Sequence, residues 1–189
     1  MANVTPIKKL LVANRGEIAR RIMRTAHDMG ISTVAIFAEG DARAPFVHEA
    51  DTAISLEGRT SAETYLDVEK VINACKRSGA DAVHPGYGFL SENENFAQAI
   101  IDAGIKWIGP SPNVIGLMGD KLSAKNLMQE AGVPTLPAIE IHDDTDIKKS
   151  AKEIGYPVLV KASAGGGGRG MRVVEKESGL ESSVEGAKR

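Results

Sequence analysis

Short apolar runs alternate with amphipathic segments over residues 1 to about 110. The run "KKLLVA" (residues 8–13) predicts a buried parallel strand, and "STVAIFAEGD" predicts the next one. The segment between them predicts a helix, whose apolar face carries Ile18, Ile22, Met23, Ala26 and Met29. Strand, helix and strand within about 30 residues form a βαβ unit, which implies a parallel sheet with a right-handed connection.

The same alternation continues through three further apolar runs, "TAISL", "DAVHPG" and "KWIG", each of which predicts a strand. A helix is expected from Glu63 to Ser78, with Tyr65, Val68, Ile72 and Cys75 on its apolar face. A second helix is expected in "SENENFAQAIIDAG", with Phe96, Ala99, Ile100 and Ala103 on its apolar face. We therefore expect residues 1–118 to form an α/β domain with a Rossmann-like parallel sheet.

The pattern changes after this domain. Prolines and glycines separate two short helical segments, 113–117 and 121–131, so that residues 119–133 are expected to connect two domains. Residues 134–189 predict a helix, two strands joined by a glycine-rich turn, and the start of another helix. Such a unit covers little apolar surface for an independent domain, so we expect the chain to be a fragment of a longer protein.

Composition narrows the classes of function. The 23 basic and 25 acidic residues leave a net charge of −2, which predicts neither a nucleic-acid partner nor a membrane surface. The single cysteine, Cys75, excludes an internal disulfide. The start of the chain lacks the pattern of a signal or transit peptide, and no apolar stretch approaches the roughly 20 residues of a membrane helix. The expected location is the cytoplasm.

The most unusual stretch is "VLVKASAGGGGRGMRVV" (residues 158–174). A strand-like segment follows the glycines, which argues against a dinucleotide fingerprint, and neither a P-loop nor the residue order of a kinase is present. Bare glycine amides can approach phosphate oxygens, and Lys161, Arg169 and Arg172 add positive charge beside them. The stretch predicts a triphosphate site, and the alternative is a solvent-exposed hairpin.

Three other stretches could carry chemistry. "NRGE" (residues 14–17) and "HPGYGFLSEN" (residues 84–93) both follow strands, at the edge where α/β folds bind ligands. The alternative is a purely structural one: Asn14 and Glu17 would form a capping box, Ser91 or Glu92 would cap a helix, and the backbone would satisfy His84. Lys121 lies in the first turn of a helix, where a bound anion would offset its charge, although a solvated surface lysine remains the alternative.

Four motifs together resemble the biotin carboxylase family, in order and in approximate separation. They are "VANRGEIARRI", "HPGYGFLSEN", "MGDK" and "VKASAGGGGRGMRVV". The resemblance covers essentially the whole chain and implies an ATP-grasp fold, in which residues 134–189 form a truncated lid subdomain. It also implies ATP- and bicarbonate-dependent carboxylation of biotin through a carboxyphosphate, in an acyl-CoA carboxylase or a related enzyme.

The resemblance assigns roles to residues of this chain. Lys121 and Lys161 are expected to contact the nucleotide, the backbone of Gly165, Gly166, Gly167 and Gly168 to cover its phosphates, and Met171 to lie near the same pocket. Tyr87 and Gly88 are expected to face the biotin ureido ring, and Glu92 to line the reaction centre as a catalytic residue. The expected partners are a biotin carboxyl carrier protein or domain, a carboxyltransferase subunit and a second copy of the chain.

The sequence departs from the family pattern in two respects. Ala164 stands where many relatives carry glycine, which should slightly stiffen the entry to the loop. The family's ligands for Mg²⁺, its bicarbonate-binding arginines and its catalytic base fall downstream of Arg189, so we expect this chain by itself to be inactive. A carboxylate-amine ligase of the ATP-grasp superfamily and a non-catalytic nucleotide-binding or dimerisation module remain the alternatives.

Overall fold

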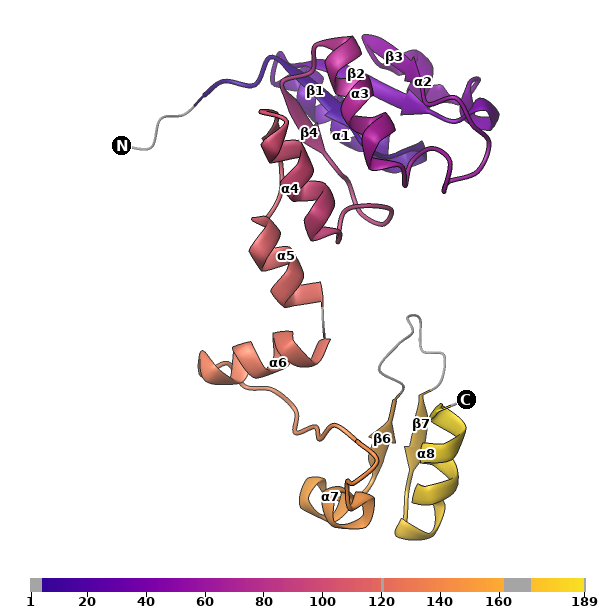
Figure 1. Cartoon of the computed structure of the whole chain (residues 1–189), viewed down its shortest axis with the longest axis vertical. Coiled ribbons are helices and arrows are strands. Elements are labelled where there is room, and N and C mark those ends of the chain that lie inside the picture. Colours follow the sequence, from indigo (N-terminus) through magenta and orange to yellow (C-terminus); the bar gives the residue numbers. More distant parts are fainter. Residues whose placement is uncertain (1–4, 120, 162–170, 189) are drawn as a thin grey trace. The chain divides into compact units, whose positions relative to one another are not determined.

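The chain divides into two compact units, unit 1 (residues 1–127) and unit 2 (residues 128–189), in a computed structural model that describes residues 5–119, 121–161 and 171–188 (Figure 1). Each unit has its own hydrophobic core. Helix α6 (Lys121–Glu130) spans the boundary between them. Within the described part of the chain, no helix is long and apolar enough to cross a membrane.

Unit 1 is built around a five-stranded parallel sheet with the strand order β3-β2-β1-β4-β5. Its strands are β1 (Lys9–Val12), β2 (Ser32–Phe37), β3 (Thr52–Ser55), β4 (Ala82–His84) and β5 (Lys106–Trp107). Its other helices are α1 (Gly16–Asp28), the short 3-10 helix η1 (Glu39–Asp41), α2 (Pro45–Glu49), α3 (Val68–Ser78), α4 (Glu94–Asp102) and α5 (Pro112–Gly119). The predicted α/β class and parallel sheet are confirmed.

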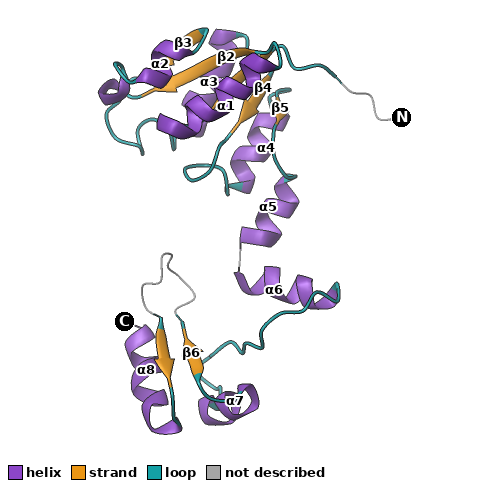
Figure 2. Cartoon of the chain, turned by 180° about the vertical axis from the view of Figure 1, so that it is seen from behind, coloured by secondary structure: helices purple, strands orange, loops and turns teal. Residues whose placement is uncertain are grey.

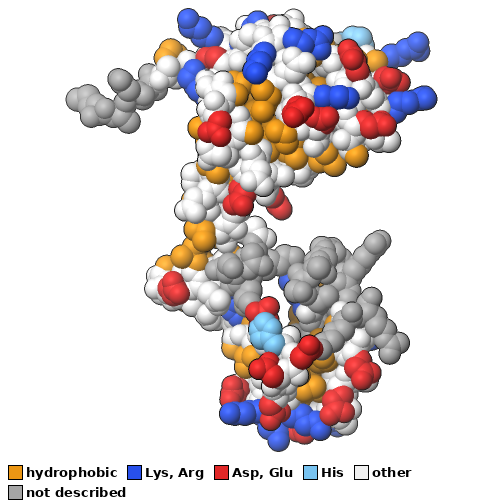
Figure 3. Space-filling model, in the orientation of Figure 1, with side chains coloured by type: hydrophobic (Ala, Val, Ile, Leu, Met, Phe, Trp, Pro, Cys, Tyr) orange, Lys and Arg blue, Asp and Glu red, His pale blue; other side chains and the backbone are white. Residues whose placement is uncertain are grey.

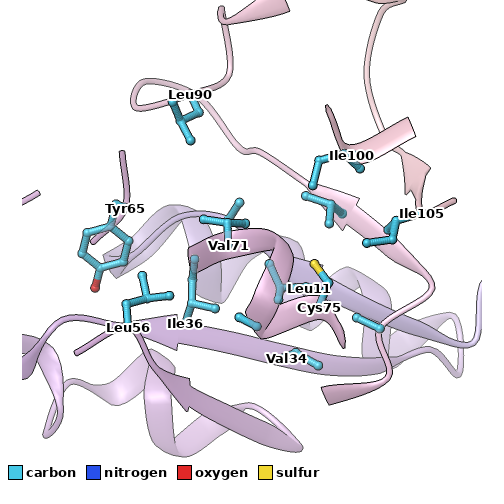
Figure 4. Close-up of a cluster of buried hydrophobic side chains, with 14 of the residues drawn as sticks. Leu11, Val34, Ile36, Leu56, Tyr65, Val71, Cys75, Leu90, Ile100 and Ile105 are labelled. Atoms are coloured by element: carbon cyan, nitrogen blue, oxygen red, sulfur yellow. The ribbon is translucent and has the colours of Figure 1, made fainter. Parts of the chain in front are cut away.

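Helices cover both faces of this sheet, which explains why its strands read as nearly continuous apolar runs (Figures 1 and 2). On one face, Leu11 and Val34 belong to a cluster with side chains of α3 and α4, and Cys75 is fully buried in that cluster (Figure 4). On the other face, Val12 and Ala35 contact side chains of α1 and α2. Alternate residues of one strand thus enter two different cores.

Three details of the predicted helices are wrong. Ala103, expected on the apolar face of its helix, is the exposed C-cap residue of α4. Helix α3 begins at Val68, five residues later than Glu63, because the Asp67 side chain accepts a hydrogen bond from the backbone N–H of Lys70 and caps the helix there. Tyr65 is buried, but it lies in the turn before the helix. Met29 follows the last residue of α1, and its side chain is 69% exposed instead of buried. Helix α2 and η1 had no predicted counterpart.

Unit 2 is a two-stranded antiparallel sheet with helices on one face. Its elements are α7 (Ile147–Ile154), β6 (Val158–Val160), β7 (Arg172–Val174), the 3-10 helix η2 (Glu177–Gly179) and α8 (Leu180–Lys188). Val158, Val160 and Val174 face the core with residues of both α-helices. Two ion pairs link α7 to η2 and α8, and acidic and basic side chains mix over that end of the unit (Figure 3).

Candidate active site

The strand order of unit 1 reverses direction between β1 and β4. The chain runs outward from β1 through β2 to β3 and then returns to place β4 on the other side of β1. Open α/β sheets bind ligands outside the carboxyl ends of the strands at such a switch point. The two segments that leave the sheet here are residues 14–17, after β1, and residues 85–89, after β4. We call residues 85–89 the switch-point loop.

Asn14 connects these two segments. Its side chain is 1% exposed, and its Nδ2 donates hydrogen bonds of 2.9 Å to the carbonyl oxygens of Pro85 and of Tyr87. Its Oδ1 accepts from the backbone N–H of Arg15. The alternative of a capping box is therefore wrong: Arg15 occupies the N-cap position of α1 without a side-chain cap, and the Asn14 carboxamide holds the switch-point loop.

The switch-point loop has an unusual backbone. Gly86 and Gly88 have φ values of +68° and +69°, and Phe89 has a φ value of +44°. A Cβ atom built on Gly86 would lie 2.7 Å from Ile18 Cγ2 and 2.8 Å from Asn14 Nδ2. Glycine at position 86 thus meets both a left-handed conformation and a close approach to α1 and Asn14.

Tyr87, which the resemblance assigns to biotin binding, extends from this loop into solvent, with 62% of its surface exposed. Its hydroxyl donates a hydrogen bond to the Glu17 carboxylate, and this bond raises the pKa of Tyr87. His84 accepts a hydrogen bond of 3.0 Å from the N–H of Gly86 at Nδ1, so the backbone does satisfy this side chain. Burial lowers the pKa of His84, which favours the neutral ring that this hydrogen bond requires.

A second set of contacts supports the loop from the far side. Phe89 stacks on Tyr65, with ring centroids 5.0 Å apart. The Tyr65 hydroxyl donates to Asp41 at 2.6 Å and accepts from the N–H of Ala38 at 3.1 Å. Asp41 in turn forms an ion pair with Arg15. Sequence alone did not predict this set, because Tyr65 is spaced like a residue of an apolar helix face and Asp41 ends the stretch that predicts the second strand.

Glu92 lies in the turn before α4, where its side chain is exposed. It lines an open cavity of about 440 Å³. The other lining residues are Phe89, Asn93, Glu94, Asn95, Ile115, Gly116 and Gly119. Asn93 caps α4 by accepting from the N–H of Phe96 at 2.9 Å, so the alternative of a cap at Ser91 or Glu92 is wrong. Glu92 is therefore free of a capping role. Among the described residues, no group of three or more His, Cys, Asp and Glu side chains could hold a metal ion.

The expected nucleotide-binding residues belong largely to unit 2. Lys161 follows β6 and Met171 precedes β7, and because Val160 pairs with Arg172, both residues lie at the same end of the two-stranded sheet. Lys161 is exposed, and Met171 is 44% exposed. Gly165, Gly166, Gly167 and Gly168 lie outside the described residues. Of Lys121 the structure describes only the backbone, at the start of α6.

The open face of this sheet was not predicted from the sequence. Leu159 and Val173 form a cross-strand pair, and they are 57% and 64% exposed. Their neighbours Val158 and Val174 are buried on the opposite face. All three residues of β6 are apolar, so the sequence alone does not show which of them faces outward. Lys161, the residue after β6, therefore lies two positions from the exposed Leu159.

Comparison with known proteins identifies the family. The model of the biotin carboxylase N-terminal domain matches residues 6–115, more than half of the chain. The chain belongs to the biotin carboxylase family. Residues 120–189 match the ATP-binding domain of the carbamoyl-phosphate synthase L chain. The resemblance drawn from the four motifs is thus confirmed.

Two relatives show how much of the chain this similarity covers. The chain is 49% identical over 188 residues to the mitochondrial methylcrotonoyl-CoA carboxylase subunit alpha of Dictyostelium discoideum, covering 98% of the chain and 27% of the relative. It is 49% identical over 181 residues to biotin carboxylase of Haemophilus influenzae, covering 94% of the chain and 40% of the relative. The chain therefore spans less than half the length of these relatives.

A solved structure shares the fold. The biotin carboxylase domain of Hydrogenobacter thermophilus 2-oxoglutarate carboxylase superposes with a TM-score of 0.86 at 49% identity, covering 97% of this chain and 41% of that one. That structure is a dimer in complex with MgADP, ADP and bicarbonate. The neighbour confirms the predicted fold class, a Rossmann-like sheet followed by part of an ATP-grasp domain.

Proposed function

We propose that these residues form the N-terminal part of a biotin carboxylase that carboxylates biotin on a carrier protein, with ATP and bicarbonate as co-substrates. In this reaction bicarbonate attacks the γ-phosphorus of ATP and ADP leaves, which gives carboxyphosphate. Carboxyphosphate then releases phosphate and CO2, and N1 of biotin, after losing its proton, attacks the carbon of CO2. The activity is proposed for the complete carboxylase to which these residues belong.

One observation carries the proposal: a chain of this family presents an exposed tyrosine from a constrained loop at the switch point of its sheet. Tyr87 and Gly88 offer a ring and a bare backbone to the flat ureido group of biotin. Glu92 lies a few residues later, beside the open cavity, and we assign it to the reaction centre. Its carboxylate is exposed in the chain by itself, so it is accessible to a substrate.

For the nucleotide, we propose a site on the two-stranded sheet of unit 2. The exposed Leu159 and Met171 offer apolar contact to a base, and Lys161 offers a fixed positive charge to phosphate oxygens. The amides of Gly165, Gly166, Gly167 and Gly168 would cover the phosphates, and Lys121 would add a second charge. Mg²⁺ would enter the site bound to ATP. We assign none of the residues of this chain as its ligands.

The assembly follows from the same proposal. A biotin carboxyl carrier protein or domain would deliver biotin, and a carboxyltransferase subunit would pass the carboxyl group to an acyl-CoA or a related acceptor. We also propose a homodimer in the cytoplasm. Neither nucleic acid nor a membrane is expected as a partner.

The test of the activity is the incorporation of labelled bicarbonate into biotin by the complete carboxylase. Incorporation should require MgATP and should fall by about 100-fold or more in Glu92→Gln, because the carboxylate would be lost from the reaction centre. A rate of ATP hydrolysis that depends on an added amine and not on biotin would instead indicate a carboxylate-amine ligase. Nucleotide binding without turnover would indicate a non-catalytic module.

The test of the nucleotide site is titration calorimetry of MgATP into the 189-residue chain. Lys161→Ala combined with Lys121→Ala should abolish the heat of binding. Lys149→Ala, which removes an exposed lysine of α7 in the same unit, is the matched control and should bind as the wild type does. Equal loss in the control would contradict a specific site, and no heat from a folded wild-type chain would show that these residues alone do not bind the nucleotide.

A further inference from the structure

We propose that Asn14 is a positioning residue for biotin: its carboxamide holds the switch-point loop in the conformation that presents Tyr87 and Gly88 to the substrate. The inference rests on the proposed function, because it takes biotin as the ligand of this loop. Asn14 itself would not touch biotin. It would act through the backbone of residues 85–87.

The Asn14 side chain uses both of its N–H donors and also its acceptor oxygen. Its two side-chain N–H groups donate hydrogen bonds to the carbonyl oxygens of Pro85 and Tyr87, each at 2.9 Å, and its oxygen accepts a hydrogen bond from the backbone N–H of Arg15. A carboxamide supplies two donors and an acceptor from one short side chain, which neither aspartate nor leucine can do. With the side chain 1% exposed, water cannot replace these bonds without a rearrangement of the loop.

The two carbonyl groups belong to the residues before and after Gly86, so the carboxamide is hydrogen-bonded to the backbone on both sides of that glycine. Gly86 is in the left-handed conformation and lies so close to Asn14 Nδ2 that a Cβ atom would be 2.8 Å away. The side chain of Asn14 and the backbone of Gly86 therefore fit each other directly. Loss of the donors would leave two partly buried carbonyl groups without partners and would favour a different turn.

The position of Tyr87 depends on the same segment. Its carbonyl group is bound by Asn14 and its hydroxyl by Glu17 of α1, so both ends of the residue are tied to the stretch that follows β1. The hydroxyl contact is exposed and can exchange with water, whereas the carbonyl contact is sheltered. The part-buried bond to the carbonyl group thus fixes the backbone from which the exposed ring projects.

The first experiment compares Asn14→Asp with Thr33→Val in the complete carboxylase. Aspartate keeps the size of the side chain but cannot donate to the two carbonyl groups when it is ionised. Thr33 is a matched control, because it is 0% exposed, forms hydrogen bonds with Asp51 and lies near the start of β2, at the opposite end of the strands from the switch-point loop. Both variants remove hydrogen bonds of a buried side chain, but only Asn14→Asp affects the loop.

For Asn14→Asp we expect kcat/KM for biotin to fall by about 10- to 100-fold through a higher KM for biotin, as a displacement of a binding group by about 1 Å would produce. The KM for MgATP should stay within about twofold of the wild-type value, because none of the residues proposed to bind the nucleotide belongs to the switch-point loop. A twofold change corresponds to well under about 1 kcal/mol. Thr33→Val should keep both values. If kcat/KM for biotin is unchanged in Asn14→Asp, or falls equally in Thr33→Val, the inference is overturned.

A second measurement does not require activity. In ¹H–¹⁵N spectra of the wild-type chain, the side-chain NH2 protons of Asn14 should exchange with solvent at least about tenfold more slowly than those of an exposed asparagine such as Asn73. In Asn14→Asp, the amide resonances of Gly86 and Gly88 should shift, and in Thr33→Val they should not. Fast exchange in the wild type, or unshifted glycines, would overturn the inference even if Asn14→Asp folds poorly. A wild-type carboxylase that never carboxylates biotin would refute the proposed function, while the spectra would still decide whether Asn14 positions the loop.

Discussion

Two regions of the chain carry the candidate ligand-binding residues, and they are built in opposite ways. In unit 1 the switch-point loop follows a sheet that is covered on both faces, and the buried side chains of Asn14 and Tyr65 support it. In unit 2, Lys161 and Met171 flank a two-stranded sheet of which the described residues cover one face. The first region is constrained by its own interior, and the second exposes apolar side chains.

The difference follows from burial. A polar group beside a doubly covered sheet has little water to bind, so its hydrogen bonds must come from the protein, and these bonds define one geometry. An exposed apolar pair such as Leu159 and Val173 gains its stabilising contacts only when a partner covers it. We therefore expect the loop of unit 1 to be largely formed before a ligand arrives, and the face of unit 2 to be completed by its ligand.

The largest effect should come from Phe96→Ala, which tests how far the two units are independent. Phe96 is 0% exposed and packs edge-on against Trp107, with centroids 5.5 Å apart. Its truncation should lower the free energy of unfolding of unit 1 by about 3–5 kcal/mol. Urea unfolding followed by the fluorescence of Trp107, the only tryptophan, measures this change. Methyl resonances of Val158 in unit 2 should keep their unfolding midpoint, and an equal shift there would contradict independent units.

Leu180→Ala is the corresponding test in unit 2. Leu180 is 2% exposed in the small core between α8 and the two strands, so its truncation should cost about 2–4 kcal/mol. Leu136→Ala makes the same chemical change at a side chain that is 86% exposed, and it should alter the free energy of unfolding by less than about 0.5 kcal/mol. Circular dichroism during urea unfolding separates the variants. Comparable losses in both would mean that burial does not determine stability in this unit.

Tyr65→Phe probes the contacts behind the switch-point loop. Without the hydroxyl, the N–H of Ala38 and the Asp41 carboxylate each lose a partner, which should cost about 1–2 kcal/mol of the stability of unit 1. Tyr87→Phe is the matched control, because its hydroxyl also donates to a carboxylate but is exposed. Its unfolding midpoint, measured by Trp107 fluorescence, should equal that of the wild type. Equal destabilisation by the two changes would refute the distinction between buried and exposed contacts.

The smallest effect concerns pH and His84. Burial lowers the pKa of His84 in the folded state, whereas an unfolded histidine titrates near pH 6.5. As the pH falls below about 6.5, the unfolded chain binds the proton first, so the stability of unit 1 should decrease until the folded-state pKa is reached. Above that range His84 contributes no slope. His84→Asn should reduce the loss of stability between pH 7.5 and pH 5.5, and an unchanged loss would show that other groups cause it.

Much of the fold could be predicted because its signals are local. The apolar runs of β1 and β2 follow from a sheet covered on both faces, and the spacing within α1 identifies Met23 and Ala26 as buried. The start of α3 was missed because Tyr65 has the right spacing for its apolar face, and only the competing cap at Asp67 ends that pattern.

The candidate site was predictable in part. Its two segments follow strands, which indicated the correct edge of the sheet, but the bond from Asn14 to Pro85 joins residues 71 positions apart. The ion pair between Arg15 and Asp41 spans 26 positions. No local pattern encodes such contacts, so the same asparagine could be interpreted equally well as a helix cap. Only the return of β4 to the side of β1 decides between the two roles.

The core of unit 1 also has a practical consequence for labelling. Cys75 is fully buried, and burial raises the pKa of Cys75 to about 12, so its thiol stays protonated and out of reach of alkylating reagents in the folded chain. Because it is the only cysteine, the wild-type chain should be nearly silent towards a maleimide dye. A cysteine introduced at Val173 would then be the single reactive position, and a fluorophore there could report directly when the open face of unit 2 becomes covered.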